Sequence, residues 1–287
     1  MKQGIGKQSD VVRLPRLAAS SYLNTAPLIW SFQHGTRRRA VELITDAAPA
    51  RCADLLARGA VDAALVPVIE YQRIDDLMVV PGVCVGASSR VRSVVLVTRG
   101  VALKDVRRIA LDASSRTSAA LVQVIFREFF QQAPLVVAQS PDVRRMLEDC
   151  DAALIIGDPA MVFSREGLFV YDLAELWREH TGLGFVFAMW MARGENFARI
   201  VRDADFSGAR DEGLKHVEEI IAHYQRELGL SHAELRSYLL ENISFDLSAG
   251  MRAGLDLFYA LAHKHKLIPA IRPLKFFDAR TNQFHGD

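Results

Sequence analysis

The fold is decided by residues 16–28, RLAASSYLNTAPL, because residues 108–121, RIALDASSRTSAAL, repeat the same pattern further along the chain. Each stretch is typical of a short apolar strand, a turn rich in Ser and Thr, and a helix with one apolar face. A β-rich run follows in both cases, VELIT at 41–45 and LVVA at 135–138, and Pro49 or Pro141 then opens a second helix. DAAL, at 62–65 and at 151–154, begins a last strand in each copy. The order strand, helix, strand, helix, strand therefore occurs twice.

This repeated order predicts an α/β protein with two lobes, each built on a parallel sheet covered by helices. Apolar strand patterns at 92–99 and 184–192 are long for simple connections, and we expect them to be crossover segments between the lobes. Helical patterns between residues 214 and 265 are expected to return to the first lobe. The predicted boundaries are 12–93 with 189–287 for lobe one, and 94–188 for lobe two.

Ligands of parallel α/β sheets bind beyond the carboxyl ends of the strands. Those ends are predicted at residues 20–25, 67–71, 114–118 and 157–159. Two of these turns are rich in Ser and Thr and lead into helices, whose unpaired N–H groups and dipole favour an anion. Facing lobes would place two such sites on one cleft, which suits a compact ligand with two negative groups. The alternative is that the hydroxyls are ordinary helix N-caps.

Composition and motifs narrow the functional class. The chain has 287 residues, enough for about two domains, and a net charge of +1, which favours neither nucleic acid nor an anionic membrane. Its 3 cysteines, without a C-x-x-C pair, support neither a disulfide framework nor a zinc site. The motifs of dinucleotide, P-loop, zinc-protease and Ser-hydrolase sites are missing.

The N-terminal sequence MKQGIGKQSD has no apolar run of the kind that a secretory signal needs, and no stretch is apolar enough to span a membrane. We therefore expect a cytoplasmic protein whose first eleven or so residues are a disordered lead-in.

Four motifs resemble the chorismate dehydratase family, which opens the futalosine route to menaquinone: SYLNTAPL at 21–28, VRSV at 91–94, DASSRTS at 112–118 and IGDPA at 156–160. The similarity continues through YDL at 171–173, Trp177, TGL at 181–183, FVFA at 185–188, LFY at 257–259 and LIP at 267–269. It covers nearly all of the chain after Arg13. It implies a type II periplasmic-binding-protein-like fold with two crossover strands, and conversion of chorismate to 3-[(1-carboxyvinyl)oxy]benzoate without a cofactor or metal.

The resemblance also implies site residues. The Asn of the SYLN turn and the Ser of the RSV crossover are the family's catalytic residues, and they correspond to Asn24 and Ser93. Neither is a good base at neutral pH. The hypothesis is that the enolpyruvyl carboxylate of the substrate takes the proton, with Asp158 as the competing base. The remaining residues expected to bind substrate are Ser21, Tyr22, Pro67, Arg92, Ser115, Arg116, Thr117, Ser118, Gly157 and Asp158.

Three other functions stay open on the sequence. A non-catalytic binder of a small dicarboxylate would have the same lobes but would be exported. Dihydroxynaphthoate synthase, of the same pathway, shares the fold but not the SYLNTxPL opening. The effector domain of a transcription regulator would need a helix-turn-helix partner, for which the residues before the first strand leave no room. The expected partner is the small-molecule substrate alone, and the oligomeric state is not predicted.

Overall fold

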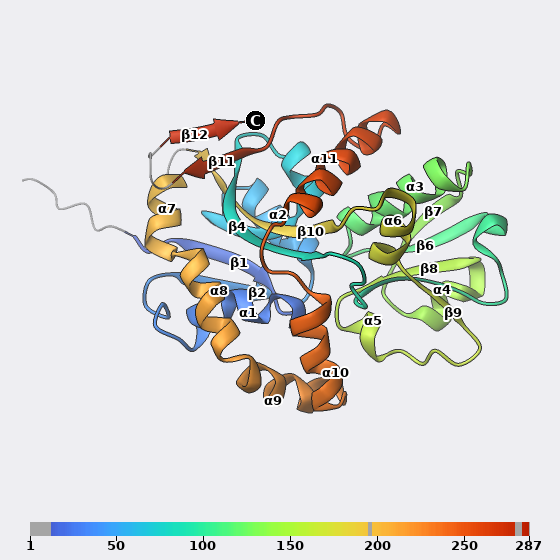
Figure 1. The fold of residues 1–287 in the computed structure, drawn as a ribbon, viewed down its shortest axis with the longest axis horizontal. Coiled ribbons are helices and arrows are strands. Elements are labelled where there is room, and N and C mark those ends of the chain that lie inside the picture. Colours follow the sequence, from blue (N-terminus) through green and yellow to red (C-terminus); the bar gives the residue numbers. More distant parts are fainter. Residues whose placement is uncertain (1–12, 195–196, 279–282, 287) are drawn as a thin grey trace, which may run out of the picture.

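The computed structural model describes residues 13–194, 197–278 and 283–286, in two α/β lobes side by side (Figure 1). One lobe contains the N-terminal strands together with the C-terminal third of the chain, and the other contains the middle. The two-lobed α/β architecture expected from the repeat is confirmed. The prediction of parallel sheets is wrong, because strands outside the repeated unit add antiparallel pairs to both sheets. The predicted lead-in lies outside the described residues.

The first sheet has the strand order β12-β11-β4-β10-β3-β1-β2. Strand β1 lies between β2 and β3 and is parallel to both, whereas β10 pairs antiparallel with β3 and with β4. The sheet is thus completed by strands from distant parts of the chain. Its strands are β1 (Arg16–Ser20), β2 (Glu42–Asp46), β3 (Ala63–Pro67), β4 (Leu77–Ala87), β10 (Phe185–Arg193), β11 (Lys275–Asp278) and β12 (Gln283–Gly286).

The second sheet repeats this arrangement in the order β7-β6-β8-β5-β9. Strand β6 is parallel to β7 and β8, and β5 is antiparallel to β8, in the position that β10 occupies beside β3. The equivalent strands therefore end at equivalent places in the two lobes. The strands are β5 (Val94–Thr98), β6 (Arg108–Asp112), β7 (Leu135–Gln139), β8 (Ala152–Ile156) and β9 (Phe169–Asp172).

The helices begin and end where local sequence signals place them. Gly229 ends α9 in the left-handed conformation, and Ser231 begins α10 with a capping box to Glu234, as the sequence predicts. Helix α4 begins at Val143, with Asp142 as its N-cap, two residues after the predicted Pro141. The α-helices are α1 (Ala26–Gln33), α2 (Pro49–Ala57), α3 (Thr117–Phe129), α4 (Val143–Asp149), α5 (Pro159–Val162), α6 (Leu173–Thr181), α7 (Phe197–Ala204), α8 (Phe206–Lys215), α9 (Val217–Leu228), α10 (His232–Ser237) and α11 (Ala249–Lys264).

Four short helical segments complete the described structure. Three are 3₁₀ helices, η1 (Leu23–Thr25), η2 (Val68–Gln72) and η3 (Leu103–Asp105), and the fourth, η5 (Tyr238–Asn242), is a π-helix. Two residues separate η1 from β1, and η2 follows β3 directly, at the edge of the first sheet that faces the second lobe. They therefore determine which side chains meet the other lobe.

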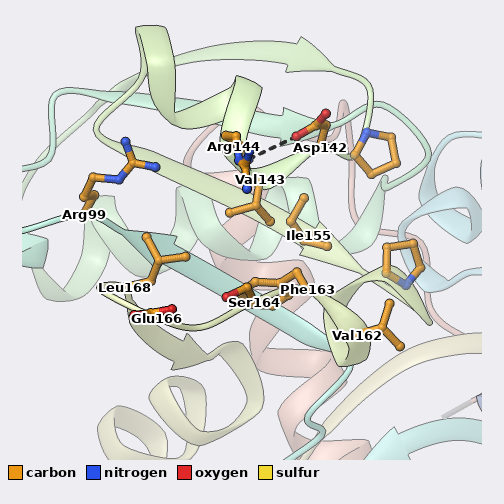
Figure 2. Close-up of a pocket in the computed structure, with 12 residues that line it drawn as sticks. Arg99, Asp142, Val143, Arg144, Ile155, Val162, Phe163, Ser164, Glu166 and Leu168 are labelled. Atoms are coloured by element: carbon orange, nitrogen blue, oxygen red, sulfur yellow. Dashed lines mark hydrogen bonds between the residues drawn. The ribbon is translucent and has the colours of Figure 1, made fainter. Parts of the chain in front are cut away.

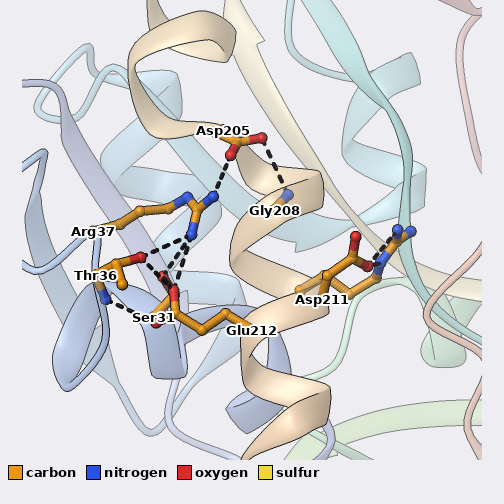
Figure 3. Close-up of polar contacts among 8 residues, drawn as sticks. Ser31, Thr36, Arg37, Asp205, Gly208, Asp211 and Glu212 are labelled. Atoms are coloured by element: carbon orange, nitrogen blue, oxygen red, sulfur yellow. Dashed lines mark hydrogen bonds and ion pairs between the residues drawn. The ribbon is translucent and has the colours of Figure 1, made fainter.

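Helix α8 returns the C-terminal third of the chain to lobe one by packing on α1. A Cβ on Gly213 would lie 2.0 Å from Pro27 O, so this contact requires glycine. Next to it, the Glu212 carboxylate accepts hydrogen bonds from Ser31, from Thr36 and from Arg37, which also pairs with Asp205 (Figure 3).

One apolar cluster extends through both lobes, and a smaller one lies within lobe two. A single cluster of buried side chains includes Leu17 and Val66 of the first sheet together with Leu96 of the second and Leu121 of α3. Helix α11 contacts α3, and the Arg127 guanidinium donates to His265 O over 2.9 Å. The described structure is therefore one in which the lobes are closed on each other.

Candidate functional site

A pocket lies where the two lobes meet, and an interface between domains is a usual place for a small-molecule site. Lobe one contributes residues that follow β1 and β3, and lobe two contributes residues that follow β6 and β8. The predicted site residues that line it are Tyr22, Asn24, Pro67, Ser115, Arg116, Thr117, Ser118 and Gly157. Residues that follow the predicted strand ends of both lobes therefore line the same pocket.

Ten further residues line the pocket. The polar members are Ser20, Thr25 and Ser114, and the others are Pro49, Leu65, Val85, Val94, Ile156, Phe187 and Ala188. Phe187 and Ala188 belong to the FVFA motif, but Pro49 and Val85 were missed because nothing in their local sequence marks them as site residues. The apolar members give a flat ligand hydrophobic walls.

The turn after β1 is held by its own side chains. Thr25 Oγ1 donates to Ser20 O over 2.6 Å and to Tyr22 O over 2.8 Å, which bends the chain into η1. This bend places the partly buried Asn24 on the pocket wall. Ser21 is exposed and does not line the pocket; its carbonyl accepts a hydrogen bond from the Tyr224 hydroxyl.

The turn after β6 is anchored by the buried Asp112. Its carboxylate accepts hydrogen bonds from the amide and hydroxyl of Ser114 and from Ile156 N. Helix α3 then begins at Thr117 without a side-chain cap. Ser115 Oγ is buried and has no hydrogen-bond partner within the described residues. The Ser/Thr turn therefore does not cap α3, and Ser115 keeps a hydroxyl beside the uncapped first turn of a helix.

Two contacts from the SYLN turn join the lobes beside the pocket. Gly157 adopts φ +66° and faces the Tyr22 ring so closely that a Cβ would lie 2.4 Å from a ring carbon. The Leu23 amide donates to Asp158 Oδ1 over 3.0 Å. Burial raises the pKa of Asp158 to about 6, partly opposed by the Leu23 hydrogen bond, and Glu227 adds to the rise. Asp158 contacts the back of the turn and does not line the pocket.

Both arginines predicted to bind substrate have protein partners. Arg116 lines the pocket, and its guanidinium pairs across the lobes with Glu70 at 2.9 Å and with Asp54 at 2.5 Å. Arg92, with φ +63°, donates from its side chain to Glu234 O and does not line the pocket. Among the described residues that line the pocket, Arg116 is the one whose side chain carries a formal charge. The protein groups that face a ligand are thus hydroxyls, amides and apolar side chains.

Ser93 and Asn24, far apart in the sequence, lie near one hydroxyl group. Ser93 is fully buried just before Val94, behind the pocket wall, and its carbonyl accepts a hydrogen bond from Gly157 N. Tyr238, in η5, is also fully buried, and both Ser93 and Asn24 lie close enough to its hydroxyl to lower the pKa that burial raises. No local sequence signal marks Tyr238, because only the fold brings it near Ser93 and Asn24.

Lobe two has a second pocket, between α4 and the turn after α5, lined by Arg99, Asp142, Ile155, Phe163 and Leu168 among others (Figure 2). None of the predicted site residues lines it. Throughout the described part of the chain, no three His, Cys, Asp or Glu side chains are grouped so as to hold a metal ion. The same residues include no helix with the length and apolar character needed to cross a membrane.

Known proteins share this fold over most of their length. The structure is similar to a protein from Archaeoglobus fulgidus (18% identity, TM-score 0.69, 88% of this chain and 98% of that one). It is also similar to the periplasmic aliphatic sulphonate binding protein SsuA of Escherichia coli (17% identity, TM-score 0.63, 96% and 92%). A Candida albicans protein described as having the generic periplasmic binding protein fold matches with a TM-score of 0.60 (12% identity, 91% and 92%). The expected periplasmic-binding-protein-like fold is confirmed.

Sequence comparison is more specific than the fold. The family described as "Menaquinone biosynthesis" matches residues 15–264. A chorismate dehydratase from Thermus thermophilus is 32% identical over 272 residues, which cover 86% of this chain and 93% of that protein. Because both matches span most of the molecule, the chain belongs to the menaquinone biosynthesis family.

Proposed function

We propose that this protein is a carbon–oxygen lyase that dehydrates chorismate to 3-[(1-carboxyvinyl)oxy]benzoate in menaquinone biosynthesis. The family match and the Thermus thermophilus relative support this activity. The pocket supports it as well, since it lies between the two lobes and its lining combines hydroxyl and amide groups and the paired Arg116 with apolar walls. The proposal places the protein in the cytoplasm, where chorismate is made.

The reaction removes the hydrogen on ring carbon 3 and the hydroxyl on ring carbon 4, and the ring becomes aromatic. The C3–H bond breaks and leaves its electron pair in the ring, the C4–O bond breaks, and the proton and hydroxide leave as water. Aromatisation supplies much of the driving force. The protein therefore has to orient the substrate, stabilise the charge that develops on the ring carboxylate, and assist the departing hydroxyl.

One observation supports the substrate-binding assignment most directly. The Ser115 hydroxyl is buried at the pocket, has no hydrogen-bond partner in the described part of the chain, and lies beside the uncapped start of α3. A buried hydroxyl without a partner costs about 1–3 kcal/mol, which a bound carboxylate would recover. We therefore assign one substrate carboxylate to this turn, with Thr117 and Ser118 beside it.

The base is assigned to the substrate itself. Apart from the paired Arg116, the described lining residues have no side chain that is charged at neutral pH, and Asn24 is a neutral amide. The Asp158 carboxylate is already engaged as the hydrogen-bond acceptor of Leu23 N. The enolpyruvyl carboxylate of chorismate is then the group that takes the C3 proton. Asn24 and Ser93 orient it and assist loss of the hydroxyl.

The decisive experiment is incubation of the purified protein with chorismate while the enolpyruvyl benzoate product is followed by liquid chromatography. We expect product at a rate proportional to enzyme concentration, and near-complete loss in Asn24→Ala. Tight binding of chorismate or of another dicarboxylate without product would instead indicate a capture protein. Turnover of a different pathway intermediate, with chorismate inert, would indicate a sister enzyme.

A further inference from the structure

Tyr238 is the first residue of the π-helix η5, which directly follows α10 in lobe one. Single π-turns are uncommon and often occur at functional sites, because the wider turn displaces a side chain from its α-helical position. The ring of Tyr238 is fully buried. Its hydroxyl is also buried, and within the described residues it completes no hydrogen bond of good geometry.

The surroundings of this hydroxyl are those of the proposed active site. Ser93 and Asn24 approach it closely enough to favour its ionised form, and Asp158 and Arg92 lie within electrostatic reach. Burial has the larger effect and raises the pKa of Tyr238 well above its usual 10, so the phenol keeps its proton. The Ser93 hydroxyl likewise lacks a hydrogen-bond partner in the described part of the chain. Two unpaired hydroxyls thus lie next to each other behind the pocket wall.

Other buried tyrosines of the chain differ from Tyr238 in one respect. The hydroxyl of Tyr259 donates to Val68 O over 2.7 Å, that of Tyr224 donates to Ser21 O over 2.7 Å, and that of Tyr71 donates to Pro273 O over 2.8 Å. Each of these groups is satisfied by a backbone carbonyl, as expected for a tyrosine that only stabilises the fold. The hydroxyl of Tyr238 instead faces two site side chains.

We propose that Tyr238 is a positioning residue that donates to Ser93 Oγ and thereby directs the Ser93 proton toward the departing hydroxyl of the substrate. A serine hydroxyl has one proton, so when its oxygen accepts from Tyr238 that proton is left for the ligand. In this arrangement the Tyr238 oxygen can still accept a hydrogen bond from the nearby Asn24 amide. This inference rests on the proposed dehydration and on the roles assigned there to Asn24 and Ser93.

The test is Tyr238→Phe, which removes one oxygen and keeps the ring. We expect kcat to fall tenfold or more, about 1.4 kcal/mol, while KM for chorismate stays within about threefold. Tyr259→Phe is the matched control, since it removes a hydroxyl from an equally buried ring, and its kcat should equal that of the wild type. A wild-type kcat in Tyr238→Phe would overturn the inference, and so would an equal loss in both variants.

A double-mutant cycle separates positioning from a general structural effect. If Tyr238 acts through Ser93, then Tyr238→Phe lowers kcat in the wild type but has little further effect in Ser93→Ala. Additive losses would overturn the assignment. If Tyr238→Phe does not fold, the experiment uses 3-fluorotyrosine at position 238 instead. This analogue keeps the hydroxyl and makes it a stronger hydrogen-bond donor. A changed kcat at an unchanged Tm then supports the inference, and an unchanged kcat overturns it.

The wild-type reaction distinguishes the two proposals. No product from chorismate with the wild-type protein means that the proposed function has failed. Normal product formation with an insensitive Tyr238→Phe means that only the inference has failed.

Discussion

Asp158 lies where the lobes meet, and its carboxylate accepts the Leu23 amide at the back of the pocket. If the substrate supplies the base, Asp158→Asn should keep kcat within about tenfold of the wild type, because asparagine can still accept from Leu23. Steady-state kinetics with chorismate measure this. A loss of a thousandfold or more at normal KM would instead make Asp158 the base.

The same substitution has a predictable effect on stability. The pKa of Asp158 rises from 3.8 in the unfolded chain to about 6 in the folded protein, chiefly through burial, so ionising this carboxyl opposes folding. The cost in folding free energy is absent below pH 3.8, increases up to about pH 6 and is constant above that pH. The Tm advantage of Asp158→Asn over the wild type should therefore grow between about pH 4 and pH 6 and then level off. A difference independent of pH would contradict the assigned pKa.

Ser115 tests the carboxylate site. Ser115→Ala removes a hydroxyl that no other described residue uses, so the fold should lose little stability. We expect KM for chorismate to rise by about tenfold or more, as for loss of one hydrogen bond to a charged group, about 1.5–3 kcal/mol. Ser164→Ala, in an exposed residue of the separate lobe-two pocket, is the control. Unchanged KM and kcat in Ser115→Ala would reject the assignment.

The partners of Arg116 could not be predicted from the sequence. Arg116 follows two serines at a helix start, a pattern that predicts an anion ligand. In the folded chain Glu70 and Asp54 of lobe one pair with its guanidinium. Those carboxylates are distant in sequence, and only packing of the lobes brings them to Arg116. That Arg116 also binds substrate stays a prediction, as do the catalytic roles of Asn24 and Ser93.

Among the elements, α1 and α8 depend on the polar cluster around Glu212. Burial alone would raise the pKa of Glu212, but hydrogen bonds from Ser31 and Thr36 and the charge of Arg37 hold it at about 2. The ionised carboxylate therefore stabilises the fold fully above pH 4.5, and this contribution is lost as the pH falls toward 2. Glu212→Gln should lower the free energy of unfolding by about 1–3 kcal/mol at pH 7 and by about half as much or less near pH 3.

Chemical denaturation at the two pH values measures this difference. Glu148→Gln, in an exposed residue of α4, is the control and should have little effect at either pH. An equal destabilisation by Glu212→Gln at both pH values would contradict the role of the charged carboxylate.

Helices and strands with a signal in their own sequence were predictable, and those that form only through contacts with distant parts of the chain were not. Strands β1 and β6 and the helices after them follow from apolar periodicity and turn residues that lie within a few positions. The capping box at Ser231 is equally local. The π-turn at Tyr238 has no such signal, and β4 and β11 are strands because they find neighbours far along the chain. Tertiary packing, absent from any short window, decides these elements.

For the whole molecule, the repeat of strand order across the two sheets predicts lobes that move as units. The boundaries at 93/94 and 188/189, with hinges near Ser93 and Ala188, stay a prediction. In the described structure three polar contacts between the lobes lie around the pocket, at Asp158, at Arg116 and at Thr117, whose hydroxyl accepts from Ile69 N. Others, such as that from Arg127 to His265 O, lie between α3 and α11. A ligand that bridges the same turns would favour the closed form over an open one.

Gly157→Ala tests that closure directly. The new methyl group would lie 2.4 Å from the Tyr22 ring, so it should keep the lobes apart. We expect KM for chorismate to rise more than about tenfold. Solution scattering should show a radius of gyration that no longer decreases when substrate is added.

Gly167→Ala is the matched control, because Gly167 also lies in lobe two at φ +69° but has no neighbour within 4 Å among the described residues. Both variants incur the left-handed backbone penalty of about 1–2 kcal/mol, so a defect confined to Gly157→Ala belongs to the contact between the lobes. Wild-type KM and wild-type compaction in Gly157→Ala would show that closure does not depend on the fit of Tyr22 against Gly157.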